Sequence, residues 1–340
     1  MEVVRIYLQL SKARLSTLVV ITTLAGFLAA TPRGLDTDWP LLGWTLLGTA
    51  IAAASAAMWN QFLERRTDAS MERTAGRPLP AGRVSVLHVF VAATLLSFAS
   101  WAILLAWSTV GAAMLALGTI VLYAAVYTPM KRLSTLNTIV GAVTGATPPL
   151  IGWVAARHDD FGGGGWTLAA LLFVWQLPHF FALSWMYRDD YARGGLKMLP
   201  VFDPDGRVTA LVCLSTSLLL VPTSLMATLE GVAGIWYALV ATILGLWLSW
   251  AALRFARCRD DASARRLFLA SLVYLPPVLA ALVLDRGPAT VAAEFRGSGI
   301  AIRDGWPSVA PSVAPSVTPP VMPSATPPGV DALPAPPGGP

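Results

Sequence analysis

Long apolar runs separated by short polar segments occupy the chain from residue 14 to residue 285. Most hold about 20 residues, the length an α-helix needs to cross the hydrocarbon core of a bilayer at about 1.5 Å per residue. Nine runs can be placed, over residues 14–31, 40–60, 84–106, 109–127, 137–156, 166–187, 208–227, 232–253 and 267–285. The pattern predicts an all-α, polytopic membrane protein with nine transmembrane helices.

The first run has an alternative interpretation as a cleaved signal peptide, because it ends in the small residues Ala29 and Ala30. It is long for the apolar region of such a peptide, and the segment before it is also long and contains Glu2. We therefore expect a retained helix.

The composition also indicates that the protein is embedded in a lipid bilayer. Hydrophobic residues make up 55% of the 340 residues and charged residues 13%, against about 25% charged in a typical soluble domain. The net charge of +5 raises the question of nucleic acid, but that function needs a basic patch on a soluble fold. Here the basic residues lie between apolar runs, so no nucleic-acid partner is expected.

The basic residues also indicate orientation. If the N-terminus lies in the cytoplasm, 19 of the 24 Lys and Arg residues fall in the inner segments. Short cytoplasmic loops of membrane proteins carry such an excess. The distribution predicts a multi-pass protein of the cell inner membrane with a cytoplasmic N-terminus.

The composition changes near residue 287. Pro, Ser, Val, Ala and Thr dominate the remainder, in repeated short patterns that cannot bury an apolar core. Two regions follow: a transmembrane domain over residues 1–286 and a disordered, Pro-rich C-terminal tail over residues 287–340.

A polar stripe continues from the second run. Asn60, Glu64 and Asp68 are spaced by four residues, so each is rotated by only about 40° from the last on a helix of 3.6 residues per turn. Such a carboxylate row suits Mg²⁺, which takes oxygen ligands and shares them with substrate phosphates. The alternative is a solvated face that forms ion pairs with neighbouring arginines.

A second acidic segment, with Asp189 and Asp190, follows the sixth run. Four spans separate the two acidic segments, so both emerge on one side of the membrane. Tyr127 and Lys131 lie on that side as well. Opposed carboxylates can hold Mg²⁺ against a diphosphate whose remaining charge Lys and Arg neutralise. Alternatively, Lys131 is a charge anchor and Tyr127 an interfacial aromatic.

These motifs resemble the UbiA superfamily of intramembrane prenyltransferases over about residues 5–285. The first motif is carried by Asn60, Glu64, Asp68, Arg73 and Arg77-Pro78-Leu79-Pro80, and the Tyr-x-x-x-Lys element by Tyr127 and Lys131. The run from Trp175 through Pro178-His179 to Leu183 is similar to the protohaem farnesyltransferase, or haem O synthase, branch. Two positions depart from the pattern: Glu64 stands where Asp is common, and Met186 where many relatives have a further Asp.

The resemblance implies nine helices enclosing a membrane-level cavity, and transfer of a farnesyl group from farnesyl diphosphate to a vinyl group of protohaem IX with addition of water. It implies Asn60, Glu64, Asp68 and Asp190 as Mg²⁺ ligands, Arg73, Arg77, Lys131 and Lys197 as diphosphate-binding residues, and Tyr127 as the ring facing the allylic cation. Association with haem A synthase or oxidase assembly factors is a further expectation. A pocket within lipid would keep water from the cation.

His179 has two interpretations. A neutral imidazole within the sixth run could bind the haem iron, for which His is a common axial ligand. Alternatively, it forms a helix–helix hydrogen bond beside the kink at Pro178.

Two other functions remain open at this point. A quinone precursor or a chlorophyll-type ring as acceptor would keep the acidic segments and change the middle helices. A transporter usually needs ionisable residues near the bilayer midplane, whereas most acids here lie at one edge.

Overall fold

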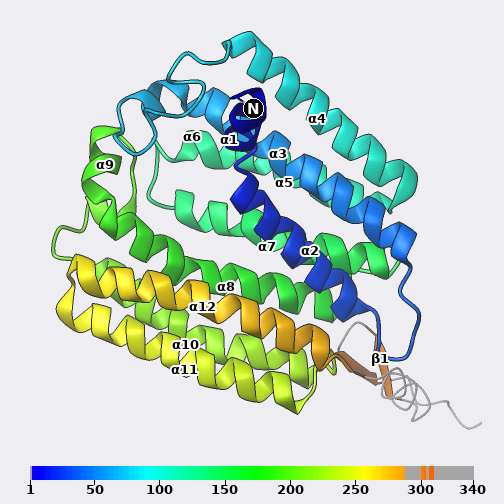
Figure 1. The fold of residues 1–340 in the computed structure, drawn as a ribbon. Coiled ribbons are helices and arrows are strands. Elements are labelled where there is room, and N and C mark those ends of the chain that lie inside the picture. The colour runs from blue at the N-terminus through cyan, green and yellow to red at the C-terminus, as the bar shows by residue number, and fades with distance from the viewer. Residues whose placement is uncertain (1, 288–299, 304–305, 310–340) are drawn as a thin grey trace, which may run out of the picture.

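The computed structural model describes residues 2–287, 300–303 and 306–309 (Figure 1). Within this part of the chain, nine helical segments are long and apolar enough to cross a membrane, as the hydropathy pattern predicts. They are α2 (Ala13–Ala30), α3 (Trp39–Ala69), α4 (Val86–Trp107), the segment Val110–Met130, α7 (Asn137–Ala156), α8 (Gly163–Met186), α10 (Arg207–Leu229), α11 (Ile235–Cys258) and α12 (Asp261–Leu284).

The segment Val110–Met130 is not a uniform α-helix. It consists of α5 (Val110–Val121), a π-helical stretch η1 (Leu122–Tyr127) and α6 (Thr128–Met130). Three short helices lie outside the spans: α1 (Glu2–Leu10), α9 (Arg188–Arg193) and the 3-10 turn η2 (Leu199–Val201). These helices are too short to be predicted from apolar runs of membrane-spanning length.

Helix boundaries follow local capping as well as hydropathy. Helix α12 begins six residues before its predicted start because the Asp260 carboxylate accepts a hydrogen bond from the backbone N–H of Ser263 at 2.7 Å. Helix α3 continues nine residues past its predicted end at residue 60, to Ala69. This extension carries the polar stripe on a helix, as its spacing predicts.

Part of the predicted tail has secondary structure. Strands β1 (Ile300–Arg303) and β2 (Trp306–Val309) pair antiparallel, with Ile300 opposite Val309. These eight residues lie within the predicted disordered tail, whose other residues from 288 on lie outside the described residues, and the division of the chain at residue 286 stays a prediction.

The long helices lie side by side, with α4 at one edge, α10 and α11 at the other, and α2, α7 and α8 between them (Figure 1). Successive spans pack on one another, α2 also packs on α7, and α12 contacts both α8 and α2. Helices α7 and α8 are the most deeply buried. Backbone hydrogen bonds fasten the end that lies away from α1: Arg33 N–H donates to Gly287 O, and Gly287 N–H donates to Val232 O, both at 3.0 Å. Gly287, assigned by composition to the tail, thus belongs to the helical bundle.

Helices α2 and α7 approach closely at two glycines. A Cβ atom on Gly152 would overlap the backbone of Thr23, and one on Gly26 would overlap the backbone of Pro149. Backbone atoms cannot rotate away as a side chain can. We predict that Gly152→Ala lowers the free energy of unfolding by about 1–3 kcal/mol, measured by thermal denaturation in detergent. Gly43→Ala is the control, because nothing lies near its added methyl; equal midpoints for the two variants would contradict the prediction.

Candidate active site

Three buried polar residues lie along the last turns of α3. Asn60, Glu64 and Asp68 are between 0% and 7% exposed, and each is bound to a cation from another segment. The pairs are Lys12 Nζ with Asn60 Oδ1 at 2.6 Å, Lys131 Nζ with Glu64 Oε1 at 2.7 Å, and Arg77 Nη1 with Asp68 Oδ2 at 2.6 Å. The stripe is therefore a buried charge network and not a solvated helix face.

These residues line one wall of a cavity of about 1020 Å³, which we call the polar pocket. Its opposite wall comes from α8 and the segment after it, including Phe180, Leu183 and Met198. Asp68 Oδ1 is buried and has no hydrogen-bond partner among the described residues. The polar pocket thus combines three bound cations with a free carboxylate oxygen.

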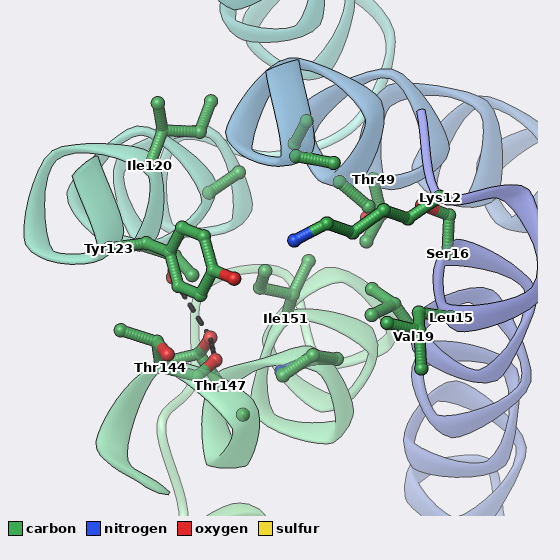
Figure 2. A pocket seen from close by; sticks show the side chains of 17 residues that line it. Lys12, Leu15, Ser16, Val19, Thr49, Ile120, Tyr123, Thr144, Thr147 and Ile151 are labelled. Atoms are coloured by element: carbon green, nitrogen blue, oxygen red, sulfur yellow. Dashed lines mark hydrogen bonds between the residues drawn. The ribbon is translucent and has the colours of Figure 1, made fainter. Parts of the chain in front are cut away.

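A second cavity of about 720 Å³, the apolar pocket, lies between α2, α3, α5 and α7. It shares Lys12, Leu15 and Tyr123 with the polar pocket, so the two cavities meet. Figure 2 shows the Lys12 ammonium and the Tyr123 ring directed into the apolar pocket from opposite sides. Together the pockets suit an amphiphile with an anionic head and an apolar chain.

Lys12 is a site residue that the sequence did not reveal. It adopts a left-handed backbone conformation, with φ of 48°, between α1 and α2. The Gln61 side chain fixes this corner by donating to the carbonyls of Gln9 at 3.0 Å and Leu10 at 2.9 Å. Burial, with the positive charges of Arg77 and Lys131, lowers the pKa of the Lys12 ammonium to about 7. In the sequence it resembles any basic residue flanking a span.

The Tyr-x-x-x-Lys element is assembled at the site. The Lys131 ammonium lies 4.5 Å from the centroid of the Tyr127 ring, within range of a cation–π interaction. Burial alone would lower the pKa of the Lys131 ammonium, but the adjacent Glu64 carboxylate, together with Tyr127 and Tyr123, outweighs burial and raises that pKa. Lys131 therefore stays charged.

Asp190 joins the two acidic segments but does not line the polar pocket. Its Oδ1 accepts from the backbone N–H of Glu72 and from Arg193, both at 2.9 Å, in an adjoining cavity that Asp189 also lines. Burial would raise the pKa of this carboxyl, but the hydrogen bonds from Arg193 and the Glu72 backbone lower it. Asp190 is therefore an ionised link between the loop after α3 and α9.

The predicted basic residues divide between the cavities and the surface. Arg77 lies in the polar pocket, and Arg73 lines both the polar pocket and the adjoining cavity, with its guanidinium over Tyr187 and Tyr191. Lys197 is exposed and lines neither cavity; its backbone N–H donates to Lys131 O at 2.6 Å. Lys197 thus contacts the site through its main chain.

His179 packs between helices. Its Nδ1 is 2.8 Å from Ser271 Oγ on α12, and its ring stacks between Trp175 and Phe268. This arrangement matches the helix–helix hydrogen bond, one of the two interpretations of this residue. His179 lines neither the polar nor the apolar pocket.

The polar pocket fits a divalent cation that shares its ligands with a substrate. Among the described residues, no group of three or more His, Cys, Asp or Glu side chains is arranged to hold a metal alone. Glu64, Asp68 and the Asn60 amide offer oxygens on one helix face, and Asp68 Oδ1 has no other partner. Mg²⁺ usually takes only one or two carboxylates and completes its shell with phosphate and water.

In the part of the chain that the structure describes, nine apolar helices and a cation- and carboxylate-lined pocket that meets an apolar one define a membrane-embedded enzyme for amphiphilic substrates with anionic heads. The model of the UbiA prenyltransferase family matches residues 19–273. This chain belongs to the UbiA prenyltransferase family.

Relatives and solved structures agree with this assignment. A protein named protoheme IX farnesyltransferase from Opitutus terrae is 46% identical over 281 residues, which is 82% of this chain and 94% of that protein. A structure described as digeranylgeranylglyceryl phosphate synthase superposes with a TM-score of 0.70 at 15% identity, covering 84% of this chain and 99% of the other. A UbiA homologue from Archaeoglobus fulgidus bound to DMAPP and Mg²⁺ gives 0.58 at 15% identity, with coverage of 82% and 99%. At these identities the two structures support the fold.

Proposed function

We propose that this protein transfers the farnesyl group of farnesyl diphosphate to a vinyl group of protohaem IX, forming haem O. The observation that carries the proposal is the junction of the polar and apolar pockets, which suits a diphosphate head and a prenyl chain at once. The choice of protohaem over another acceptor rests on the 46% identical relative named for that reaction.

The cations of the polar pocket would bind the diphosphate. Lys131 and Arg77 are already charged and positioned, and they can exchange their carboxylate partners for phosphate oxygens. Arg73 lines both the polar pocket and the adjoining cavity, so it could bind the diphosphate where the two meet. The side chain of Lys197 is exposed and would reach the diphosphate only from the surface. The Tyr127 ring would hold the Lys131 ammonium in place through their cation–π interaction.

Asn60, Glu64 and Asp68 would hold Mg²⁺, which supplies positive charge that stabilises the departing diphosphate. Asp190 faces the adjoining cavity, and it would hold Mg²⁺ there only by exchanging Arg193 for the metal. The C1–O bond of the substrate breaks and its electron pair leaves with the diphosphate. The vinyl carbon then attacks the allylic cation, and water adds to the resulting cation with release of a proton. The apolar walls exclude water until the carbon–carbon bond has formed.

The direct test uses purified protein in detergent with Mg²⁺, protohaem and, separately, geranyl, farnesyl and geranylgeranyl diphosphate. A haem product whose mass increases by one farnesyl group and one hydroxyl group supports the proposal. Turnover only with a quinone precursor would replace the acceptor, and no prenyl transfer to any acceptor would overturn the proposed activity.

We also propose that the polar pocket faces the cytoplasm at a bacterial inner membrane, where association with haem A synthase would let product pass to the next enzyme. Two free cysteines provide a test, because Cys213 is buried and Cys258, the last residue of α11, is exposed. We predict that a membrane-impermeant maleimide labels Cys258 in inside-out vesicles and not in intact cells. Leu35→Cys in a Cys258→Ser background should label in the opposite pattern; labelling of Cys258 in intact cells would reverse the orientation.

We further propose that the tail beyond Gly287 is dispensable. A chain ending at Gly287 keeps the hydrogen bond to Arg33 and is expected to retain activity within about twofold, because the composition of the removed segment is unsuited to forming an apolar core. A chain ending at Leu284 is the comparison, because it loses Asp285, whose carboxylate accepts from the Tyr237 N–H at 2.9 Å. Its thermal midpoint should fall. Loss of activity in the longer chain would show that the tail has a role.

A further inference from the structure

Tyr123 is a second aromatic residue at the site, placed there by the π-helical stretch η1. Its carbonyl accepts hydrogen bonds from the backbone N–H of Thr128 and from Thr128 Oγ1, the latter at 2.8 Å. Thr128 Oγ1 in turn accepts from Asn60 Nδ2 at 3.3 Å. The π-helical backbone is thereby connected to the polar stripe of α3. Such local widening of a helix occurs often at functional sites.

The position of Tyr123 differs from that of Tyr127. Tyr123 lines both pockets at their junction, where the bond between an anionic head and an apolar chain would lie. Tyr127 lines only the polar pocket. The centroids of the two rings are 5.1 Å apart, so the side chains are neighbours in one wall of the site. They would contact different parts of the substrate, because only Tyr123 also lines the apolar pocket.

The Tyr127 ring already has partners on its surface. The Lys131 ammonium lies over it, and Gly141 packs so closely that an added Cβ would touch the ring. The other two residues shared by the pockets, Lys12 and Leu15, have no π-system. Tyr123 is thus the one aromatic residue among the described lining residues that the two pockets share.

We propose that the ring of Tyr123 faces the allylic cation formed on ionisation, and that Tyr123 is a catalytic residue of the prenyl transfer proposed above. The C1–O bond breaks with its electron pair on the diphosphate, and the positive charge spreads over C1 and C3 of the prenyl chain. The electron-rich face of Tyr123 stabilises that charge without forming a bond. The charge then passes to the acceptor when the vinyl electrons form the new carbon–carbon bond.

The test replaces Tyr123 by Phe and then by Phe carrying one, two and three ring fluorines. The same fluorine series at Phe98 on α4, an exposed ring that lines neither pocket, is the control. Fluorine withdraws electron density from the ring while changing its volume little, so packing alone predicts no graded effect. We expect the single-turnover rate of diphosphate release to fall about tenfold across the series at 123, the size of one cation–π interaction, and less than about twofold at 98.

A flat series at 123, or an equal gradient at 98, would overturn the assignment. Loss of all activity already in Tyr123→Phe, with an unchanged thermal midpoint, would assign the role to the hydroxyl group and also overturn it. Diphosphate release reports ionisation of the prenyl donor whichever acceptor is used. A wild-type enzyme that forms no haem product would therefore overturn the choice of acceptor, and the series would still test Tyr123.

Discussion

Replacing Asp68 by Asn is expected to reduce turnover by about 100- to 1000-fold, the cost of removing one preorganised charge-stabilising group from an active site. Asp68 is fully buried, binds Arg77 through Oδ2 and leaves Oδ1 without a partner. Asn has nearly the same size but lacks the charge needed to hold both Arg77 and Mg²⁺. The measurement is the initial rate at saturating substrates.

Two controls accompany this variant. Asp205→Asn changes an exposed carboxylate outside both pockets and should leave the rate unchanged. Chelation of Mg²⁺ should inactivate the wild type and have little further effect on Asp68→Asn, because both act on one interaction. A variant that keeps more than about a tenth of wild-type activity would remove Asp68 from the metal site.

Lys131→Met is expected to lower both activity and stability. Lys131 and Glu64 form a buried pair with side chains 10% and 9% exposed, so loss of the ammonium leaves a carboxylate without its counter-charge. Breaking such a pair costs about 3–5 kcal/mol, whereas removing both charges is often nearly neutral. The fall in stability should appear as a lower thermal midpoint in detergent.

The double variant Glu64→Gln/Lys131→Met separates stability from catalysis. We expect it to regain most of the thermal midpoint and none of the activity, because it removes the unpaired charge and still lacks the cation for the diphosphate. A double variant no more stable than Lys131→Met would show that the pair does not couple as its 2.7 Å separation indicates.

The sequence predicted the features that depend on local spacing. Helix length followed from apolar runs, and the face shared by Asn60, Glu64 and Asp68 followed from a four-residue repeat that α3 carries to Ala69. The contribution of Lys12 and Tyr123 was not visible. One depends on a left-handed turn fixed by Gln61, and the other on a π-helical stretch bonded through Thr128.

The second acidic segment shows a different limit. Charge and span counting brought Asp190 to the same end of the bundle as α3, and the structure joins the two loops through its hydrogen bond to Glu72. Which cavity the carboxylate faces depends on the path of α9. Likewise, the sequence predicted Lys197 as a cation near the site, but it did not reveal that Lys197 contacts the site through its backbone N–H, which donates to Lys131 O.

The two cavities draw on different stretches of the chain. Every residue lining the apolar pocket lies between Lys12 and Ile151, whereas the wall of the polar pocket facing α3 includes residues between Phe180 and Met198. Under the proposed function, the prenyl chain would therefore contact residues from the first half of the chain, whereas the diphosphate pocket draws on both halves. Preference for the length of the prenyl donor can then diverge during evolution through substitutions in the first half alone, while the part of the diphosphate pocket between Phe180 and Met198 is inherited unchanged.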